Sequence, residues 1–435
     1  MIDLDKLTNI LNGFSVDYAD FRIFRQRDLE VALRHDSFDI YEYSSESIIF
    51  RTMVDGGYGV ASTDNYSVDH IKEVCRLAIK QARMCKGGMA LLPIRVEQGE
   101  YEHPIKKGIE IDEVCEFLRY LEKEIRDSLS QFYTRSELIF SYHELESDFI
   151  TSEGARIRER KPLIEITLYV LAKDHMQGYS SEIVGGMGGY EVILQKPWDR
   201  IVEVLVERAK SSSKASASKF NGERLKVILD YNGAGAIAHE VAHMLEADTY
   251  QKELFANLNF GDLEIVDDPT LSGGYGSFHW DDEGVKSVKK RLISKDGVNL
   301  LHTRLTAKCG DVAGNAHGIT HKPRPMISNV FIRPSDWRCE EIFEDTRHGV
   351  YAEGIVRAEG DVANGRIEIV PEIAYLIEKK QITKPIRGFR IVGHVSDIQR
   401  IDAIGEECSL RPNVEKGYPV SEGSPYIRID GINCY

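Results

Sequence analysis

Three residues in one short segment have the types and the spacing that metal chemistry requires. His239 and His243 are four positions apart, and Glu240 follows the first histidine. On a helix, positions i and i+4 share one face, so both imidazoles can bind one ion while Glu240 stays beside it. The pattern H-E-x-x-H is typical of zinc hydrolases, in which the metal activates a water and the glutamate passes its proton to the leaving amine. It predicts two metal ligands and a general base, Glu240.

A catalytic zinc ion usually has three protein ligands and one open position, so a further side chain is required. Glu246, Asp248 and His279 are candidates that follow the motif, and Cys408 is a distant candidate near the C-terminus. Spacing alone does not choose among them. The alternative interpretation is that the two histidines are ordinary core or surface residues whose partners are Glu246 and Asp248.

The elements around the motif predict a rigid support. Residues 225–230 have the pattern of a strand, and the turn at 232–235 leads into a helix with Asn232 as its N-cap. Small apolar residues dominate the helix, which indicates a buried position. Beyond Asp248 the chain is rich in turns and strand patterns, so the second half is expected to be mainly β.

The first half alternates between strand and helix patterns, which indicates an α/β domain with a mixed or antiparallel sheet and covering helices. Strands are expected at 20–25, 29–34, 47–54, 136–146, 148–151 and 163–171, and helices at 68–84, 112–129 and 198–212. The polar tract 211–218 has the composition of a linker. We therefore predict an α+β protein with an N-terminal domain at 1–218 and a β-rich domain at 219–435 that carries the metal-binding helix.

Composition excludes several classes of function. The 435 residues include 55 Lys and Arg against 70 Asp and Glu, a net charge of −15. Such an acidic chain is not expected to bind nucleic acid or an anionic membrane. The seven cysteines are dispersed and odd in number, which favours reduced thiols and a cytoplasmic protein. The glycine run 185–189 lacks the G-K-[ST] of a nucleotide-binding loop.

Beyond the helix motif, six further segments in order along the chain resemble the TldD/PmbA family of metalloproteases. They are residues 51–61 (RTMVDGGYGVA), 281–285 (DDEGV), 314–318 (GNAHG), 324–329 (RPMISN), 351–354 (YAEG) and 374–378 (AYLIE). The family pattern has three residues between the glutamate and the second histidine, whereas this chain has only Val241 and Ala242. Either the helix is regular here and bulged in relatives, or the alignment of His239 is displaced by one position.

The resemblance implies one zinc ion per chain, bound by the two helix histidines and by a cysteine that matches Cys408 in position. It implies hydrolysis of peptides or unfolded segments, with Glu240 as the base. It also implies pairing, either as a homodimer or with a metal-free sister chain of the PmbA/TldE type. Two other hypotheses remain at this stage: a non-catalytic regulatory or scaffold protein that acts by binding a partner, and a nucleophilic role for Cys408 with a histidine base.

Overall fold

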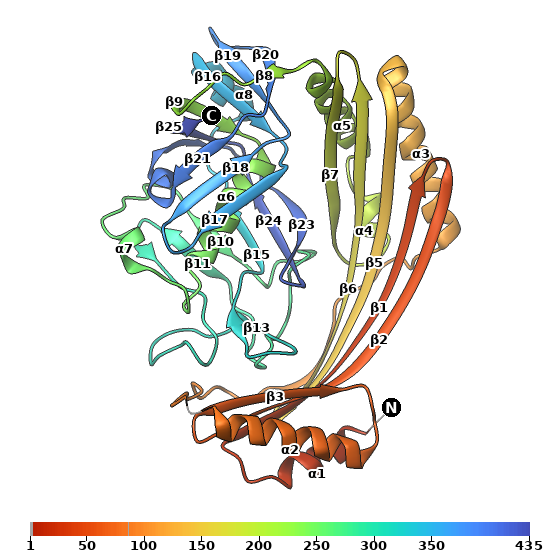
Figure 1. The fold of residues 1–435 in the computed structure, drawn as a ribbon, viewed down its shortest axis with the longest axis vertical. Coiled ribbons are helices and arrows are strands. Elements are labelled where there is room, and N and C mark those ends of the chain that lie inside the picture. Colours follow the sequence, from red (N-terminus) through yellow and green to blue (C-terminus); the bar gives the residue numbers. More distant parts are fainter. Residues whose placement is uncertain (1–2, 86) are drawn as a thin grey trace.

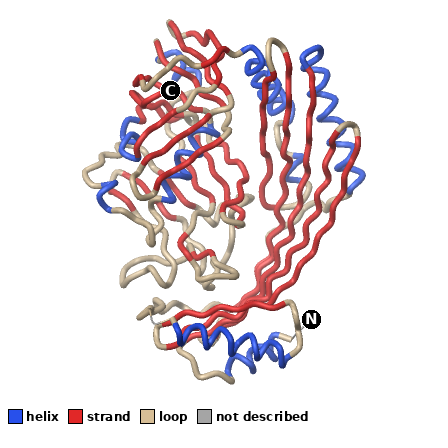
Figure 2. The backbone as a smooth tube through the Cα atoms, viewed as in Figure 1, coloured by secondary structure: helices blue, strands red, loops and turns tan. Residues whose placement is uncertain are grey.

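The computed structural model describes residues 3–85 and 87–435, and it has two halves (Figures 1 and 2). The first half is one long, curved sheet with helices packed against it. The second half is a body of β-sheets around a buried helix. This arrangement confirms the predicted α+β class and the β-rich C-terminal part.

The first sheet has seven strands in the order β3-β2-β1-β5-β6-β4, with β7 also paired to β6. Neighbouring strands are antiparallel except for the parallel pair β4 and β6. The strands are β1 (Tyr18–Arg34), β2 (Ser37–Val54), β3 (Gly57–Thr63), β4 (Gln98–Glu102), β5 (Tyr133–Thr151), β6 (Arg156–Lys173) and β7 (Gln177–Met187).

Strand β1 is one continuous strand of 17 residues, where the sequence predicts two strands at 20–25 and 29–34. Each end of β1 packs into a different core: Phe21 and Ile23 lie in one cluster, and Val31 and Leu33 lie in another. The polar residues between them are half-buried or exposed because the sheet bends there from one helix layer to the next (Figure 1). Two short hydrophobic patterns therefore belong to one long strand.

Two groups of helices cover the two ends of this sheet (Figure 1). They are α1 (Leu4–Asn12) and α2 (Val68–Met84) at one end, and α3 (Ile111–Leu129), η1 (Ser130–Phe132), α4 (Glu191–Leu194) and α5 (Trp198–Lys214) at the other. Helices α2 and α3 match the helices predicted at 68–84 and 112–129. Helix α2 approaches β3 so closely that a Cβ on Gly59 would lie 2.0 Å from the Ala78 carbonyl oxygen, so only glycine fits there.

The C-terminal half contains sheets of ten, six and two strands. The largest has β17 (Arg357–Asp361), β18 (Arg366–Val370), β21 (Ile391–His394), β25 (Ile427–Cys434), β9 (Glu223–Leu229), β16 (His348–Glu353), β19 (Ile373–Glu378), β20 (Gln381–Arg387) and β8 (Ser216–Ala217) in this order, with β22 (Ile401–Ile404) paired to β25. The second has β12 (Gly297–Val298), β11 (Lys290–Ser294), β10 (Ile265–Asp267), β15 (Asn329–Ile332), β24 (Tyr418–Ser424) and β23 (Ser409–Glu415). The third pairs β13 (Ala316–His317) with β14 (Arg324–Pro325).

Helix α6 (Tyr231–His243) lies between the two larger sheets, and eleven of its thirteen residues are buried. It contacts β15 and β24 of the six-stranded sheet and β17 and β18 of the ten-stranded sheet. The short helices α7 (Lys252–Phe255), α8 (Cys339–Asp345) and η2 (Val395–Arg400) complete this half. Since α6 carries the histidine motif, the motif is held on both sides by β-structure.

The chain passes from the first half to the second within the polar tract 211–218. Helix α5 continues to Lys214, and β8 then pairs with β20 of the C-terminal sheet. The domain division at residue 218 stays a prediction. Within residues 3–85 and 87–435, no helix combines the length and the apolar character needed to cross a membrane.

Candidate metal centre

Helix α6 begins at an aspartate that fixes its first turn. The Asp230 carboxylate accepts a hydrogen bond from the Gly233 N–H at 2.9 Å, so Asp230 is the N-cap, and Asn232, the cap expected from the sequence, lies inside the helix. The other Asp230 oxygen accepts from the Gly354 N–H at the end of β16. This second bond ties the start of the helix to the large sheet.

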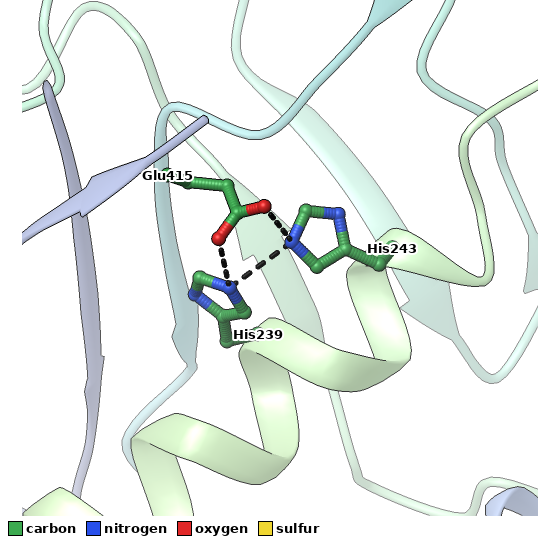
Figure 3. Close-up of side chains that lie close together, drawn as sticks. All are labelled: His239, His243 and Glu415. Carbon is green, nitrogen blue, oxygen red and sulfur yellow. Dashed lines mark hydrogen bonds and ion pairs between the residues drawn. The ribbon is translucent and has the colours of Figure 1, made fainter. Parts of the chain in front are cut away.

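The two motif histidines meet on one face of α6, near its C-terminal end (Figure 3). Their Nε2 atoms are 3.0 Å apart, and both side chains are more than nine-tenths buried. Glu415, at the end of β23, faces both of them, with its oxygens 3.7 Å from His239 Nε2 and 3.8 Å from His243 Nε2. The regular i, i+4 spacing therefore brings both imidazoles to one point.

Each histidine has a buried carboxylate on its other nitrogen. His243 Nδ1 is 2.6 Å from Glu246, and His239 Nδ1 is 2.8 Å from Glu422 of β24, although this second contact lacks the alignment of a hydrogen bond. A carboxylate at Nδ1 favours the tautomer with the proton on Nδ1, which leaves the Nε2 lone pairs facing each other. Two facing lone pairs repel unless a proton or a metal ion lies between them.

The electrostatics of the site favour a positive charge at these nitrogens. Burial opposes protonation of His239, but Glu415 and Glu422 outweigh it and raise its pKa to about 10. In return, His239 lowers the pKa of Glu415 to about 2. Burial alone would raise the pKa of Glu422, but Arg411 and His239 outweigh it and hold that pKa well below its usual range. A metal cation would compete with the proton for the same nitrogens.

Glu240 lies beside this pair and remains partly exposed. Its carboxylate packs against the backbone of β17, since a Cβ on Gly360 would lie 2.5 Å from Glu240 Oε2. Burial raises the pKa of Glu240, although both histidines act in the opposite direction. Glycine at position 360 leaves room for this side chain next to the histidines.

Three of the four residues that the sequence offers as a third metal ligand lie elsewhere or have other partners. Glu246 binds His243 through Nδ1, Asp248 pairs with Arg324 at 2.7 Å, and the ring of His279 stacks on Tyr101 at 4.2 Å between centroids. Among the described residues, His239, His243 and Glu415 form the group that could hold a metal ion. One possible ligand atom from each of them lies within 4.8 Å of the other two.

Cys408, the ligand that the family resemblance implies, lies at the opposite end of β23 from Glu415. At about 3.3 Å per residue, the seven-residue strand places the two positions about 20 Å apart. Cys408 lines a separate cavity together with Cys339, and burial raises the pKa of its thiol to about 12. Cys408 as a ligand stays a prediction, and in this conformation it is not next to the histidines.

Sequence reasoning missed Glu415 and Glu422, which complete the environment of the histidines. Both lie on the β23–β24 hairpin, far from the motif along the chain. No local pattern marks them, because acidic residues on a short hairpin are usually solvent-exposed. The arrangement that results, two imidazoles and a carboxylate with buried carboxylates behind the imidazoles, has the donor types of a catalytic zinc site.

Comparisons with known proteins show similarity to metallopeptidases along most of the chain. Residues 222–435 match the PmbA/TldA metallopeptidase C-terminal domain, and residues 106–216 match the central domain of the same family. A metalloprotease of Methanocaldococcus jannaschii is 27% identical, with 100% of this chain and 98% of that protein covered. A metalloprotease TldD homolog of Haemophilus influenzae is 24% identical, with 98% of this chain and 94% of that protein covered.

A solved crystal structure has a similar fold. The crystal structure of TldE from Thermococcus kodakarensis superposes with a TM-score of 0.81 at 18% identity and covers 99% of both chains. The two family domains together span most of the sequence, and they confirm the resemblance seen in the sequence segments. The chain therefore belongs to the TldD/PmbA family of metallopeptidases.

Proposed function

We propose that this chain is a zinc-dependent peptidase that hydrolyses peptides or unfolded polypeptide segments. The observation that carries the proposal is the pair of facing Nε2 atoms on α6, each with a carboxylate on its Nδ1 and with Glu415 opposite. Two histidines and one glutamate are a donor set that zinc accepts, and they leave a position open for water. We propose one zinc ion per chain, held by His239, His243 and Glu415, with Cys408 as the alternative third ligand.

A bound zinc ion would lower the pKa of a water molecule and polarise a peptide carbonyl. Glu240 would accept the proton from that water and transfer it to the leaving amine. Its place on the helix beside His239 and its partial exposure support this role. Glu246 and Glu422 would hold the imidazoles in the required orientation without touching the substrate.

Strand β17 offers a way to bind an extended peptide next to Glu240. It is the edge strand of the ten-stranded sheet, its residues are exposed or half-buried, and its Gly360 contacts Glu240. A peptide that adds to a free strand edge is bound through its backbone, with little dependence on sequence. We also propose, on the family relationship, that the chain acts in the cytoplasm and pairs with a second chain, either a copy of itself or a metal-free sister.

Metal content tests the site. Elemental analysis should find about one zinc per wild-type chain and little in His243→Ala. Loss of zinc in Glu415→Gln with retention in Cys408→Ala would support Glu415 as the third ligand, and the reverse result would assign that role to Cys408. Absence of metal from the wild type after zinc is supplied would contradict the proposal and favour the partner-binding hypothesis.

Glu240→Gln tests the base. This variant should keep its zinc and lose about 10²- to 10⁴-fold in the rate of peptide hydrolysis, because general-base catalysis contributes about that much. Glu253→Gln, on the exposed surface of α7, is the matched control and should hydrolyse peptides like the wild type. Wild-type activity in Glu240→Gln would exclude Glu240 as the base.

A further inference from the structure

A cavity of about 480 Å³ lies between the long sheet of the first half and the loops of the second half. Its size falls in the usual range for ligand pockets. Aromatic rings form much of its wall, contributed by Phe24 of β1, by Tyr275, Phe278 and Trp280 of one loop, and by Tyr418 of β24. Such walls favour a bulky apolar group.

Two polar atoms at this cavity have no partner within the described residues. They are Trp280 Nε1 and His317 Nε2, and the two side chains are only 7% and 8% exposed. A buried polar group without a hydrogen bond is costly, so two of them around one cavity indicate a ligand with polar atoms of its own. Burial lowers the pKa of His317 to about 4, so its ring is neutral at neutral pH.

The charged groups of the cavity do not favour a phosphate or another multivalent anion. Lys161 and Lys416 line it, but so do Asp281 and Asp282, which leaves the lining close to neutral. Trp280 can only donate a hydrogen bond, and its partner must therefore be an acceptor such as a carbonyl oxygen. An apolar side chain next to an amide carbonyl fits this combination.

The β23–β24 hairpin connects this cavity to the metal centre. Val414, Lys416 and Tyr418 line the cavity, while Glu415 between them faces His239 and His243. Since neighbouring side chains on a strand point to opposite faces, the cavity and the histidines lie on the two sides of one hairpin tip. The hairpin is also fixed across the cavity, because the Ile319 N–H donates to the Tyr418 hydroxyl at 2.6 Å.

We propose that this cavity is a specificity subsite that binds a bulky apolar side chain of the peptide substrate, with a neighbouring carbonyl oxygen accepting a hydrogen bond from Trp280. The peptide nature of the ligand rests on the proposed function. The subsite would select peptides with a large apolar residue near the bond that is cleaved. Binding at the edge of β17 would remain independent of sequence.

Binding of capped amino acids to metal-free protein tests the subsite without turnover. Calorimetric titration should show that N-acetyl-phenylalanine amide binds about tenfold or more tightly than N-acetyl-alanine amide, since the larger side chain buries several more apolar carbons. Ser47→Trp, which fills the cavity from β2, should remove this preference, and Thr320→Trp should do so from the opposite loop. Trp280→Phe should weaken binding about three- to tenfold, the effect of one lost hydrogen bond.

Tyr43→Trp is the matched control, because Tyr43 lies on the same strand as Ser47 and is 62% exposed. It should bind the phenylalanine derivative like the wild type. Equal binding of the two derivatives by the wild type, or wild-type binding by both filling variants, would overturn the subsite. Selective binding in a protein that cleaves no peptide would leave the subsite standing and contradict the peptidase instead.

Discussion

Two clusters of mostly buried carboxylates lie near the two ends of helix α6, and they differ in the cation that balances them. Near the start of the helix, Glu182, Glu353 and Glu372 surround Arg208 at 3.4, 3.9 and 3.1 Å. Near its end, Glu246, Glu415 and Glu422 surround two histidines. Arg208 is 1% exposed and cannot lose its proton, so the first cluster contains its own permanent cation.

The comparison separates a structural cluster from a functional one. Arg208 of α5 connects Glu182 of β7 in the first half to Glu353 of β16 and to Glu372, just before β19, in the second. Ser181 adds two hydrogen bonds to Glu372. No exchange of ions is required there. At the other end, the two facing Nε2 atoms hold a proton or, as we propose, a metal ion between them, and either cation can enter and leave. Buried acids alone therefore do not indicate a metal site, whereas acids behind two imidazoles that face each other support the metal site that we propose.

Removal of the permanent cation should have the largest effect. Arg208→Met leaves three buried carboxylates without their partner, so we expect it to lower the free energy of unfolding by about 3–5 kcal/mol. Urea denaturation measures this change. Arg200→Met, on the same helix, removes a cation that is 70% exposed and should cost at most about 1 kcal/mol. Equal losses in the two variants would contradict a structural role for the Arg208 cluster.

Zinc at the two histidines should stabilise the fold only when the metal is supplied. At a free zinc concentration a hundred times the dissociation constant, the free energy of unfolding should rise by about 2.7 kcal/mol. A chelator should reverse the gain, and His243→Ala should not show it. Thermal unfolding with and without zinc measures the effect. A gain of the same size in His243→Ala would mean that zinc binds elsewhere on the chain.

The carboxylate behind His243 should affect metal affinity more than stability. Glu246→Gln keeps the shape of the side chain but weakens the interaction with His243 Nδ1, and loss of such partners costs about ten- to a hundredfold in metal affinity. Competition with a zinc-binding dye measures the dissociation constant. Unchanged affinity in Glu246→Gln would show that Glu246 does not orient the imidazole.

The helix motif and the neighbouring helices were predictable because each depends on local spacing. His239 and His243 come together through the 3.6-residue period of one helix, and the apolar face of α2 repeats at the same period in the sequence. Glu415 and Glu422 were not predictable, since their position depends on how a distant hairpin packs against α6. The continuous strand β1 was also missed, because its alternating pattern breaks where the sheet bends between two cores.

The smallest predicted effect concerns the pH dependence of the Arg208 cluster. Burial raises the pKa of Glu353 to about 7, although Arg208 acts against this. Between the unfolded pKa of about 4.3 and the folded pKa, the folded protein binds more protons than the unfolded chain, so this residue's contribution to stability is lost as the pH rises through about 7. Glu353→Gln cannot titrate. Urea denaturation of the variant and the wild type is compared at pH 5 and at pH 6.5. Between these two pH values the variant should gain about 1–2 kcal/mol relative to the wild type. A constant difference between the two proteins would show that Glu353 is already ionised at pH 5. Glu359→Gln, on an exposed position of β17, should differ from the wild type by the same amount at both pH values.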